Sequence, residues 1–168
     1  MKKLGGIIAI AVLVFGCQKN EAVSNFTGNE VTYALQQGSQ FAVSGTITFR
    51  ERKDGQITAS ITLKGLDGDA KFPAHLHLGD ISTASADVAL LLNPVFGKNG
   101  SSETTFRMLA DESSIDYARL SGLNACIKIH LGDTGADRDV ILAAGNIGAA
   151  VSASIAGGRL GVAVCKSE

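Results

Sequence analysis

The sequence predicts an all-β protein, an antiparallel Greek-key β-sandwich or barrel with one short helix. Short runs of alternating apolar and polar residues recur at even spacing along the 168 residues, which is the pattern of strands that bury one face. Glycine occurs 20 times and proline twice, as expected for many short strands joined by tight turns. Hydrophobic residues make up 45% of the chain and charged residues 18%, a balance that indicates a folded body rather than a disordered one.

The first 16 residues have the features of a signal peptide. Two lysines precede an apolar run, residues 4–15, that is shorter than the about 20 residues needed to span a bilayer. The segment ends in Leu-Val-Phe-Gly-Cys, which looks like a bacterial lipobox, so Cys17 is predicted to be lipidated after cleavage. A plain secretory signal and an uncleaved anchor are the alternatives. Gln18, in place of aspartate, resembles lipoproteins bound for the outer membrane, on its periplasmic face or at the cell surface.

These features divide the chain into three parts. We expect a lipoprotein signal peptide at 1–16, a flexible tether at 17–30 and a β-domain at 31–168. The formal net charge of −1 offers no basic surface for a nucleic acid. The predicted partner is therefore the membrane, reached through a lipid on Cys17, and no motif names a protein or small-ligand partner.

A hairpin is the clearest local structure in the sequence. Residues 41–50 and 56–63 both alternate apolar and polar side chains, and Asp54-Gly55 between them supplies the positive φ angles of a tight turn. Asn93-Pro94 is predicted to end a buried strand, because proline cannot donate to a ladder. The other predicted elements are strands at 31–37, 74–78, 87–92, 103–108, 125–131, 140–144 and 159–165, a serine-capped helix at 113–120 and a solvated loop at 133–139.

All three histidines fall in two related segments. Residues 74–80 read Ala-His-Leu-His-Leu-Gly-Asp, and residues 127–133 read Ile-Lys-Ile-His-Leu-Gly-Asp. Side chains alternate between the two faces of a strand. His75 and His77 therefore share one face, opposite the apolar residues, and His130 also leaves its strand on the polar face.

Three neutral imidazoles on one face are suitable ligands for Cu(I) in a trigonal site, or for zinc with an open fourth position. Asp80 and Asp133, each three residues after a histidine, could accept hydrogen bonds from the imidazoles and orient them. His75, His77 and His130 are therefore the candidate metal ligands, with copper as the candidate cofactor and no cofactor as the alternative. The alternative is that these histidines are surface residues bonded to nearby loops.

Two cysteines remain after the one predicted to carry lipid. Outside the cytoplasm an even pair favours a disulfide, so Cys126 and Cys165 are predicted to form a bridge between two strands. Both lie at polar positions of their strands, opposite the apolar residues. In the alternative, Cys126 is a soft metal ligand on the same face as His130.

Several of these motifs, taken in order, resemble the bacterial CHRD-domain lipoproteins. The resemblance covers roughly residues 41–149 and rests on the order and spacing of the motifs rather than on any one of them. It implies a shared fold and placement at the envelope, and it assigns no molecular activity. The matching segments are 44–49, 74–77, 89–97, 104–106, 115–117, 127–133 and 145–148.

A second similarity, to the copper–zinc superoxide dismutases, overlaps the first. It is carried by a His-x-His-x-Gly-Asp motif, an Asn-Pro pair, the third histidine and a late arginine preceded by glycine, at 75–80, 93–94, 130 and 156–160. The similarity implies that His75, His77 and His130 bind copper and that Arg159 guides superoxide. Leu91-Leu92 stand where that family has its metal-bridging histidine, and the zinc histidines have no counterpart.

The sequence thus predicts an envelope-anchored lipoprotein whose β-domain is a binding or structural module with a copper site. The alternative is a copper-dependent, superoxide dismutase-like redox enzyme that uses the three histidines and Arg159. Stoichiometric metal content and a superoxide assay distinguish the two predictions.

Overall fold

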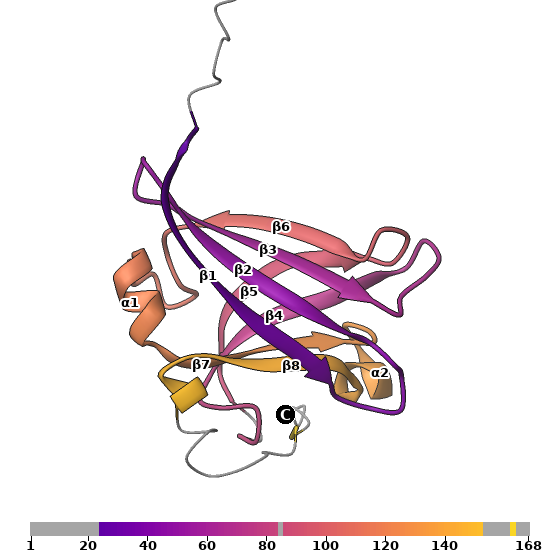
Figure 1. Cartoon of the computed structure of the whole chain (residues 1–168). Coiled ribbons are helices and arrows are strands. Elements are labelled where there is room, and N and C mark those ends of the chain that lie inside the picture. Colours follow the sequence, from indigo (N-terminus) through magenta and orange to yellow (C-terminus); the bar gives the residue numbers. More distant parts are fainter. Residues whose placement is uncertain (1–23, 84–85, 153–161, 164–168) are drawn as a thin grey trace, which may run out of the picture.

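Eight antiparallel strands close into a barrel in the computed structural model (Figure 1). The structure describes residues 24–83, 86–152 and 162–163. The predicted all-β antiparallel fold class is confirmed, and of its two forms the closed barrel is the one observed. The elements are β1 (Phe26–Gln37), β2 (Ser44–Arg52), β3 (Ile57–Lys64), β4 (Lys71–Leu78), β5 (Val88–Phe96), β6 (Ser101–Phe106), α1 (Tyr117–Gly122), β7 (Asn124–His130), α2 (Gly135–Asp139) and β8 (Ile141–Gly148).

The strand order brings distant parts of the chain together. Around the barrel the order is β1-β2-β3-β6-β5-β4-β7-β8. Strands β4, β5 and β6 follow one another as hairpins, while β3 lies beside β6 and β7 lies beside β4, which is a Greek-key arrangement. In the β4–β7 pair, Ala74 lies opposite Ile129 and His77 lies opposite Cys126. The two histidine-bearing segments are therefore neighbours.

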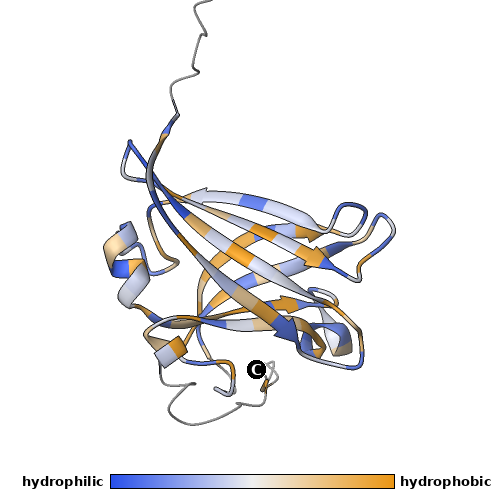
Figure 2. Cartoon of the chain, viewed as in Figure 1, coloured by the Kyte–Doolittle hydropathy of each residue, from blue (hydrophilic) through white to orange (hydrophobic). Residues whose placement is uncertain are grey.

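Apolar side chains from the strands pack inside the barrel and form its core. Phe49 on β2, Ile61 on β3, Leu76 on β4 and Ile127 on β7 are all buried. In Figure 2 the most hydrophobic residues lie along the strands, whereas the turn between β2 and β3 is hydrophilic. This turn is the predicted hairpin turn, and Gly55 adopts the expected positive φ of 78°.

Several elements differ from the predictions in their bounds. Strand β1 begins at Phe26, within the predicted tether. Phe26 pairs with Arg52 of β2 and Glu30 pairs with Arg50, with a register shift between the two pairs, so residues 26–30 belong to the barrel. The predicted helix is shorter and starts later, at Tyr117, because Asp116 rather than a serine caps it by accepting from the backbone N–H of Arg119 at 2.8 Å. The predicted solvated loop at 133–139 contains a second short helix, α2.

Strand β5 continues past the proline predicted to end it. Residue pairs on either side of the Asn-Pro step show a register shift, with Phe72 opposite Val95 and Ala74 opposite Leu92. Two residues of β5 therefore face the single residue Pro73. Because the ladder is interrupted at this bulge, the strand can continue although proline has no N–H to donate. The strand is also not buried throughout, because Leu91 is 67% exposed.

Several predictions lie outside the described residues. These are the signal peptide, the lipidated Cys17, Arg159, Cys165 and all of the strand at 159–165 except Val162 and Ala163. Among the residues that the structure describes, no helix has the length and apolar character required to cross a membrane.

Candidate metal centre

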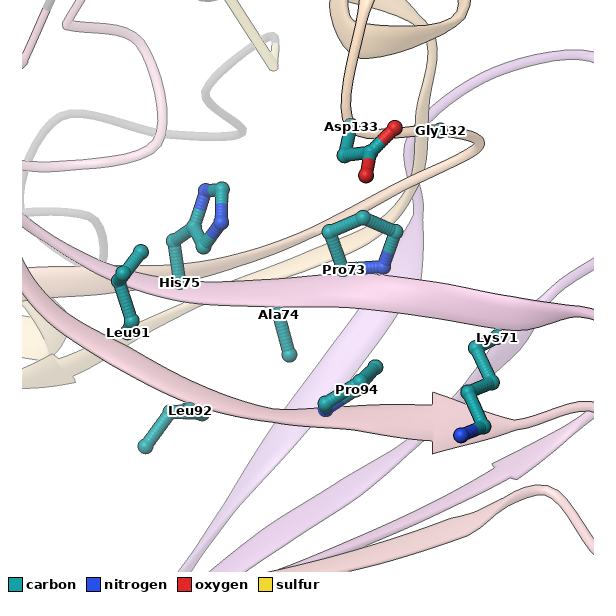
Figure 3. Close-up of a pocket in the computed structure, with 9 residues that line it drawn as sticks. All are labelled: Lys71, Pro73, Ala74, His75, Leu91, Leu92, Pro94, Gly132 and Asp133. Carbon is teal, nitrogen blue, oxygen red and sulfur yellow. The ribbon is translucent and has the colours of Figure 1, made fainter.

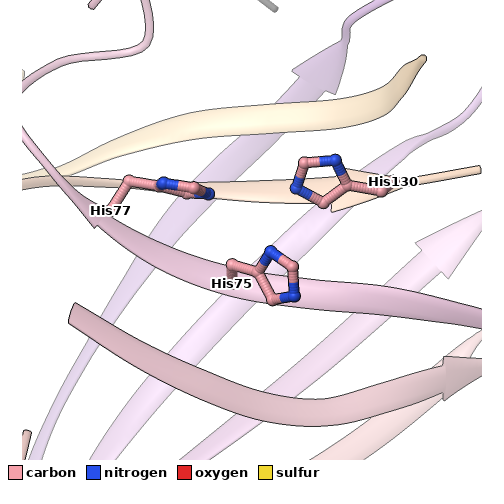
Figure 4. A group of neighbouring side chains, drawn as sticks. All are labelled: His75, His77 and His130. Atoms are coloured by element: carbon pink, nitrogen blue, oxygen red, sulfur yellow. The ribbon is translucent and has the colours of Figure 1, made fainter. Parts of the chain in front are cut away.

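The three histidines converge on the outer face of the barrel (Figure 4). His75 and His77 come from β4, and His130 ends the neighbouring β7. Their ring centroids are 5.7 Å apart for His75–His77, 4.7 Å for His75–His130 and 6.1 Å for His77–His130. One nitrogen from each ring can be chosen so that all three nitrogens lie within 4.8 Å of one another. The predicted set of ligands is therefore brought together.

Strand alternation places the rings on the predicted face, but they are not surface residues. Ala74 and Leu76 are fully buried inside the barrel, so the histidines between and after them point outward. His77 and His130 are nevertheless only 1% exposed. Ala86, in the connection after β4, contacts His77, and Arg138, in the connection after β7, contacts His130. The alternative of surface histidines bonded to nearby loops is therefore wrong in its exposure for these two residues, but its hydrogen bonds to nearby loops are confirmed. His75 is partly exposed.

Backbone carbonyl groups orient two of the rings. His77 Nδ1 lies 2.8 Å from the carbonyl oxygen of Ala86, and His130 Nδ1 lies 2.6 Å from that of Arg138. A carbonyl oxygen can only accept, so each Nδ1 carries the proton and the lone pair of each neutral ring is at Nε2. This is the tautomer in which a histidine binds a metal through Nε2 while its other nitrogen is held.

The Nε2 atom of His130 is the most direct sign that the cluster can bind a ligand. It is buried and has no hydrogen-bond partner in the described part of the chain. A buried polar atom without a partner costs about 1–3 kcal/mol, and such atoms are rare in folded proteins. A metal ion between the three rings would satisfy this lone pair.

Burial keeps the cluster neutral. It lowers the pKa of His75 to about 4, and the charges of His130 and His77 add to this effect. Burial likewise lowers the pKa of His77 to about 4, against the opposing hydrogen bond to Ala86. The pKa of His130 is also lowered, mainly by burial. All three rings are therefore in the metal-binding form at neutral pH.

The predicted aspartate partners do not orient the rings. Asp80 instead closes the turn after β4, where its Oδ1 accepts from the backbone N–H of Ser82 at 2.8 Å and from the Ser82 hydroxyl. Asp133 lines a cavity beside His75. The carbonyl groups of Ala86 and Arg138 perform the predicted role, and backbone groups leave no signature in a sequence.

A cavity of about 390 Å³ opens beside the most exposed of the three rings (Figure 3). His75 lines it together with apolar residues of β4 and β5, and Lys71 and Asp133 contribute charged groups. Figure 3 shows His75 and Asp133 on the same side of the β4 ribbon, with Pro73 between them. A small molecule could therefore approach the cluster from the His75 side.

The predicted cysteine site is only partly described. Cys126 is buried on the outer face, where it packs with Ile81, Ile141 and Ala144. Among the described residues, the group whose ligand atoms converge consists of the three histidines and does not include Cys126. The bridge to Cys165 and the role of Arg159 remain predictions, because both residues lie outside the described part.

Sequence reasoning missed one residue of the site, Lys128. It is 0% exposed, although it lies on the outer face of β7 beside the histidines. A signal was present, because Lys128 occupies the position in the second His-Leu-Gly-Asp segment that His75 has in the first.

The fold and the site together define an all-β barrel with a candidate three-histidine metal centre on its outer face. The sequence matches no model of a known protein family, and no curated protein sequence matches it either.

Proposed function

We propose that this protein is an envelope-anchored lipoprotein that binds copper through His75, His77 and His130. The observation that carries the proposal is the buried, unpartnered Nε2 of His130, with two further imidazoles whose nitrogens lie within 4.8 Å. Three imidazoles aimed at one point, two of them fixed by carbonyl groups, are an arrangement that a metal ion stabilises.

We propose copper rather than zinc, although three imidazoles are also a ligand set for catalytic zinc. Structural zinc takes four ligands, and catalytic zinc takes three with a fourth position for water. Three neutral nitrogens without a carboxylate or thiolate suit a three-coordinate Cu(I) ion, and copper also binds nitrogen ligands most tightly among the divalent first-row metals. The similarity to the copper–zinc superoxide dismutases implies the same three copper ligands. This chain lacks counterparts of the zinc-binding histidines of that family.

Placement at the envelope is supported by the lipobox-like residues that end at Cys17. The resemblance to CHRD-domain lipoproteins implies the same placement. A protein held there would meet copper outside the cytoplasm, and its barrel would act as a binding or structural module.

The test is copper binding by the purified protein. We expect one copper ion per chain and a loss of more than about 100-fold in Cu(I) affinity in each of His75→Ala, His77→Ala and His130→Ala, since even outer partners of ligands are worth about 10–100-fold. Circular dichroism should show that each variant keeps its fold, because none of the rings lies in the barrel interior.

Lys71→Ala is the matched control, because Lys71 lines the cavity beside His75 without belonging to the ligand group. It should bind copper like the unaltered protein. A wild-type protein that binds no copper, or a histidine variant with unchanged affinity, would overturn the proposal.

A copper-dependent redox enzyme is the second candidate. The observation that favours it is the cavity beside the partly exposed His75, which gives a small oxidant a route to the metal. Copper-loaded protein should then remove superoxide catalytically, and His75→Ala should abolish this activity. If the loaded protein shows no activity, the binding function stands and the enzyme is excluded.

A further inference from the structure

Lys128 is a buried cation beside the histidine cluster. Its Nζ donates to the backbone carbonyl oxygens of Thr83 at 3.2 Å and Ala163 at 2.9 Å. Both acceptors are neutral, and Lys128 takes part in neither ion pair found among the described residues. Burying an ammonium group without an opposite charge is costly. A hydrophobic residue would fill this position at lower cost.

The strand register puts Lys128 next to every histidine of the site. It lies directly opposite His75 in the β4–β7 pair, and His77, opposite Cys126, is its diagonal neighbour. His130 follows two residues later on the same face of β7. Opposite Cβ atoms on one face of a sheet are about 4.5–5.5 Å apart, and diagonal neighbours about 7–8 Å. A metal held by the three rings would therefore lie beside the Lys128 side chain.

The charge of Lys128 acts on two of the three rings. Burial is the main reason that the pKa values of His77 and His130 are lowered, and the charge of Lys128 lowers both further. Arg138 lowers the pKa of His130 as well, whereas Asp139 raises it. Arg138 and Asp139 are partly exposed, although Oδ1 of Asp139 is buried without a hydrogen-bond partner among the described residues. Their charges act on His130 in opposite directions, which leaves Lys128 as the fully buried charge beside the rings.

We propose that Lys128 makes the site selective for Cu(I) over Cu(II), an inference that rests on the copper-binding function above. The two ions differ by one positive charge, so a fixed positive charge nearby opposes Cu(II) more strongly. The ligand group contains no carboxylate to offset the second charge. Lys128 is thus a positioning residue that acts through the electrostatics of the site and not as a ligand.

The size of the effect follows from Coulomb's law. One unit charge at about 8 Å in a medium of effective dielectric constant about 20–40 changes the ratio of Cu(I) to Cu(II) affinity roughly tenfold. A purely structural role would give a different result. If Lys128 only held Thr83 and Ala163 in place, its loss would weaken the binding of Cu(I) and Cu(II) equally. The ratio of the two affinities would then stay unchanged.

The experiment measures both affinities by competition with colour-forming chelators, for Cu(I) under anaerobic reducing conditions and for Cu(II) in air. Lys128→Met keeps the length of the side chain without its charge, and Lys128→Gln keeps a donor without the charge. Lys128→Arg keeps the charge. Lys71→Met is the control, because it removes an exposed lysine that lines the cavity beside His75.

We expect the Cu(I)-to-Cu(II) affinity ratio to fall about tenfold in Lys128→Met and Lys128→Gln, and to stay near the wild-type value in Lys128→Arg and Lys71→Met. An unchanged ratio in both neutral variants overturns the inference while the copper-binding function stands. A wild-type protein that binds neither ion removes the function itself.

A measurement on the unaltered protein keeps the inference testable if the neutral variants fail to fold. Binding Cu(I) more tightly than Cu(II) raises the reduction potential of bound copper above that of the free aqueous couple. Redox titration of the copper-loaded protein should therefore give a higher potential than free copper. A lower potential would contradict selectivity for Cu(I).

Discussion

At the scale of single residues, the histidine cluster is held neutral by burial rather than by partners of opposite charge. The pKa values of His75 and His77 are lowered to about 4 from the ordinary value of 6.5. The hydrogen bonds to Ala86 and Arg138 fix Nδ1 of His77 and of His130, so the rings are set before a metal arrives. Binding of a metal ion here would therefore lose little free energy to the ordering of these two side chains.

This neutrality predicts how the stability of the metal-free protein depends on pH. Between pH 6.5 and about 4 the unfolded histidines take up protons that the folded His75 and His77 do not. The contribution of the neutral histidines to the free energy of unfolding should therefore be fully present above pH 6.5. It should decrease as the pH falls to about 4. Urea denaturation at pH 7 and pH 4.5 measures this difference.

The carboxylates contribute in a different range. The pKa of Asp80 is lowered from 3.8, mainly by the hydrogen bond from the Ser82 side chain, so its stabilising effect is lost at a pH below the range in which the histidines act.

His77→Asn tests the contribution of the histidines, and it should make the decrease in stability between pH 6.5 and 4 smaller. Equal stability of the metal-free protein at pH 7 and 4.5 would contradict burial of neutral rings.

At the scale of elements, the barrel closes through a narrow seam. Strands β1 and β8 share two residue pairs, Gln36 with Ala144 and Gln37 with Ala143. Next to them, a Cβ atom on Gly145 would lie 2.1 Å from the carbonyl oxygen of Ala34. The absence of a side chain at Gly145 therefore allows β1 to approach β8.

Gly145→Ala should destabilise the protein by on the order of 1–3 kcal/mol, the usual cost of forcing an extra carbon into a packed site. Thermal or urea denaturation measures this loss. Gly122→Ala is the control, because a Cβ atom there meets nothing within 4 Å, and it should leave stability nearly unchanged. Equal stability of the Gly145 variant and the wild type would mean that the seam is not as close as described.

The predicted cysteine bridge is a second test at this scale. A bond between Cys126 and Cys165 closes a loop of about forty residues, which the chain-entropy account values at on the order of 3–4 kcal/mol. Reducing agent should therefore lower the melting temperature, and Cys126→Ala should lower it by a similar amount and remove the effect of the reductant. Two reactive thiols in protein purified from oxidising conditions would refute the bridge.

At the scale of the whole molecule, the sequence predicted which face of the strands the histidines point to. It did not predict that the three rings come together. Alternation along a strand predicted that His75 and His77 point away from Ala74 and Leu76, because this depends only on neighbouring residues. The approach of His130 depends on β4 lying beside β7, a long-range pairing of the Greek-key order. No local pattern encodes that pairing.

The partners of the site were also beyond sequence reasoning. The aspartates after each histidine were plausible acceptors, but Asp80 is used by its own turn. The true acceptors are main-chain carbonyl groups, which every residue has. Lys128 is buried because segments far along the chain, at Thr83 and Ala163, lie over it, and its polar character alone predicted exposure.

Anchoring of the whole protein is predicted to depend on Cys17, which lies outside the described residues. If Cys17 carries the lipid, Cys17→Ser should move the protein from the membrane fraction to the soluble fraction, as measured by fractionation and immunoblotting. The melting temperature should not change, because the barrel begins at Phe26. Retention of the variant in membranes would exclude a lipid anchor at this cysteine.

X-ray absorption spectroscopy of the Cu(I)-loaded protein tests the three-histidine site most directly. We expect three nitrogen ligands at about 2 Å, with the outer-atom scattering of imidazole rings. His130→Ala should reduce the number of imidazole ligands. A sulfur ligand at about 2.3 Å, as expected if Cys126 binds the metal, or fewer than three imidazoles in the wild-type protein, would contradict the account.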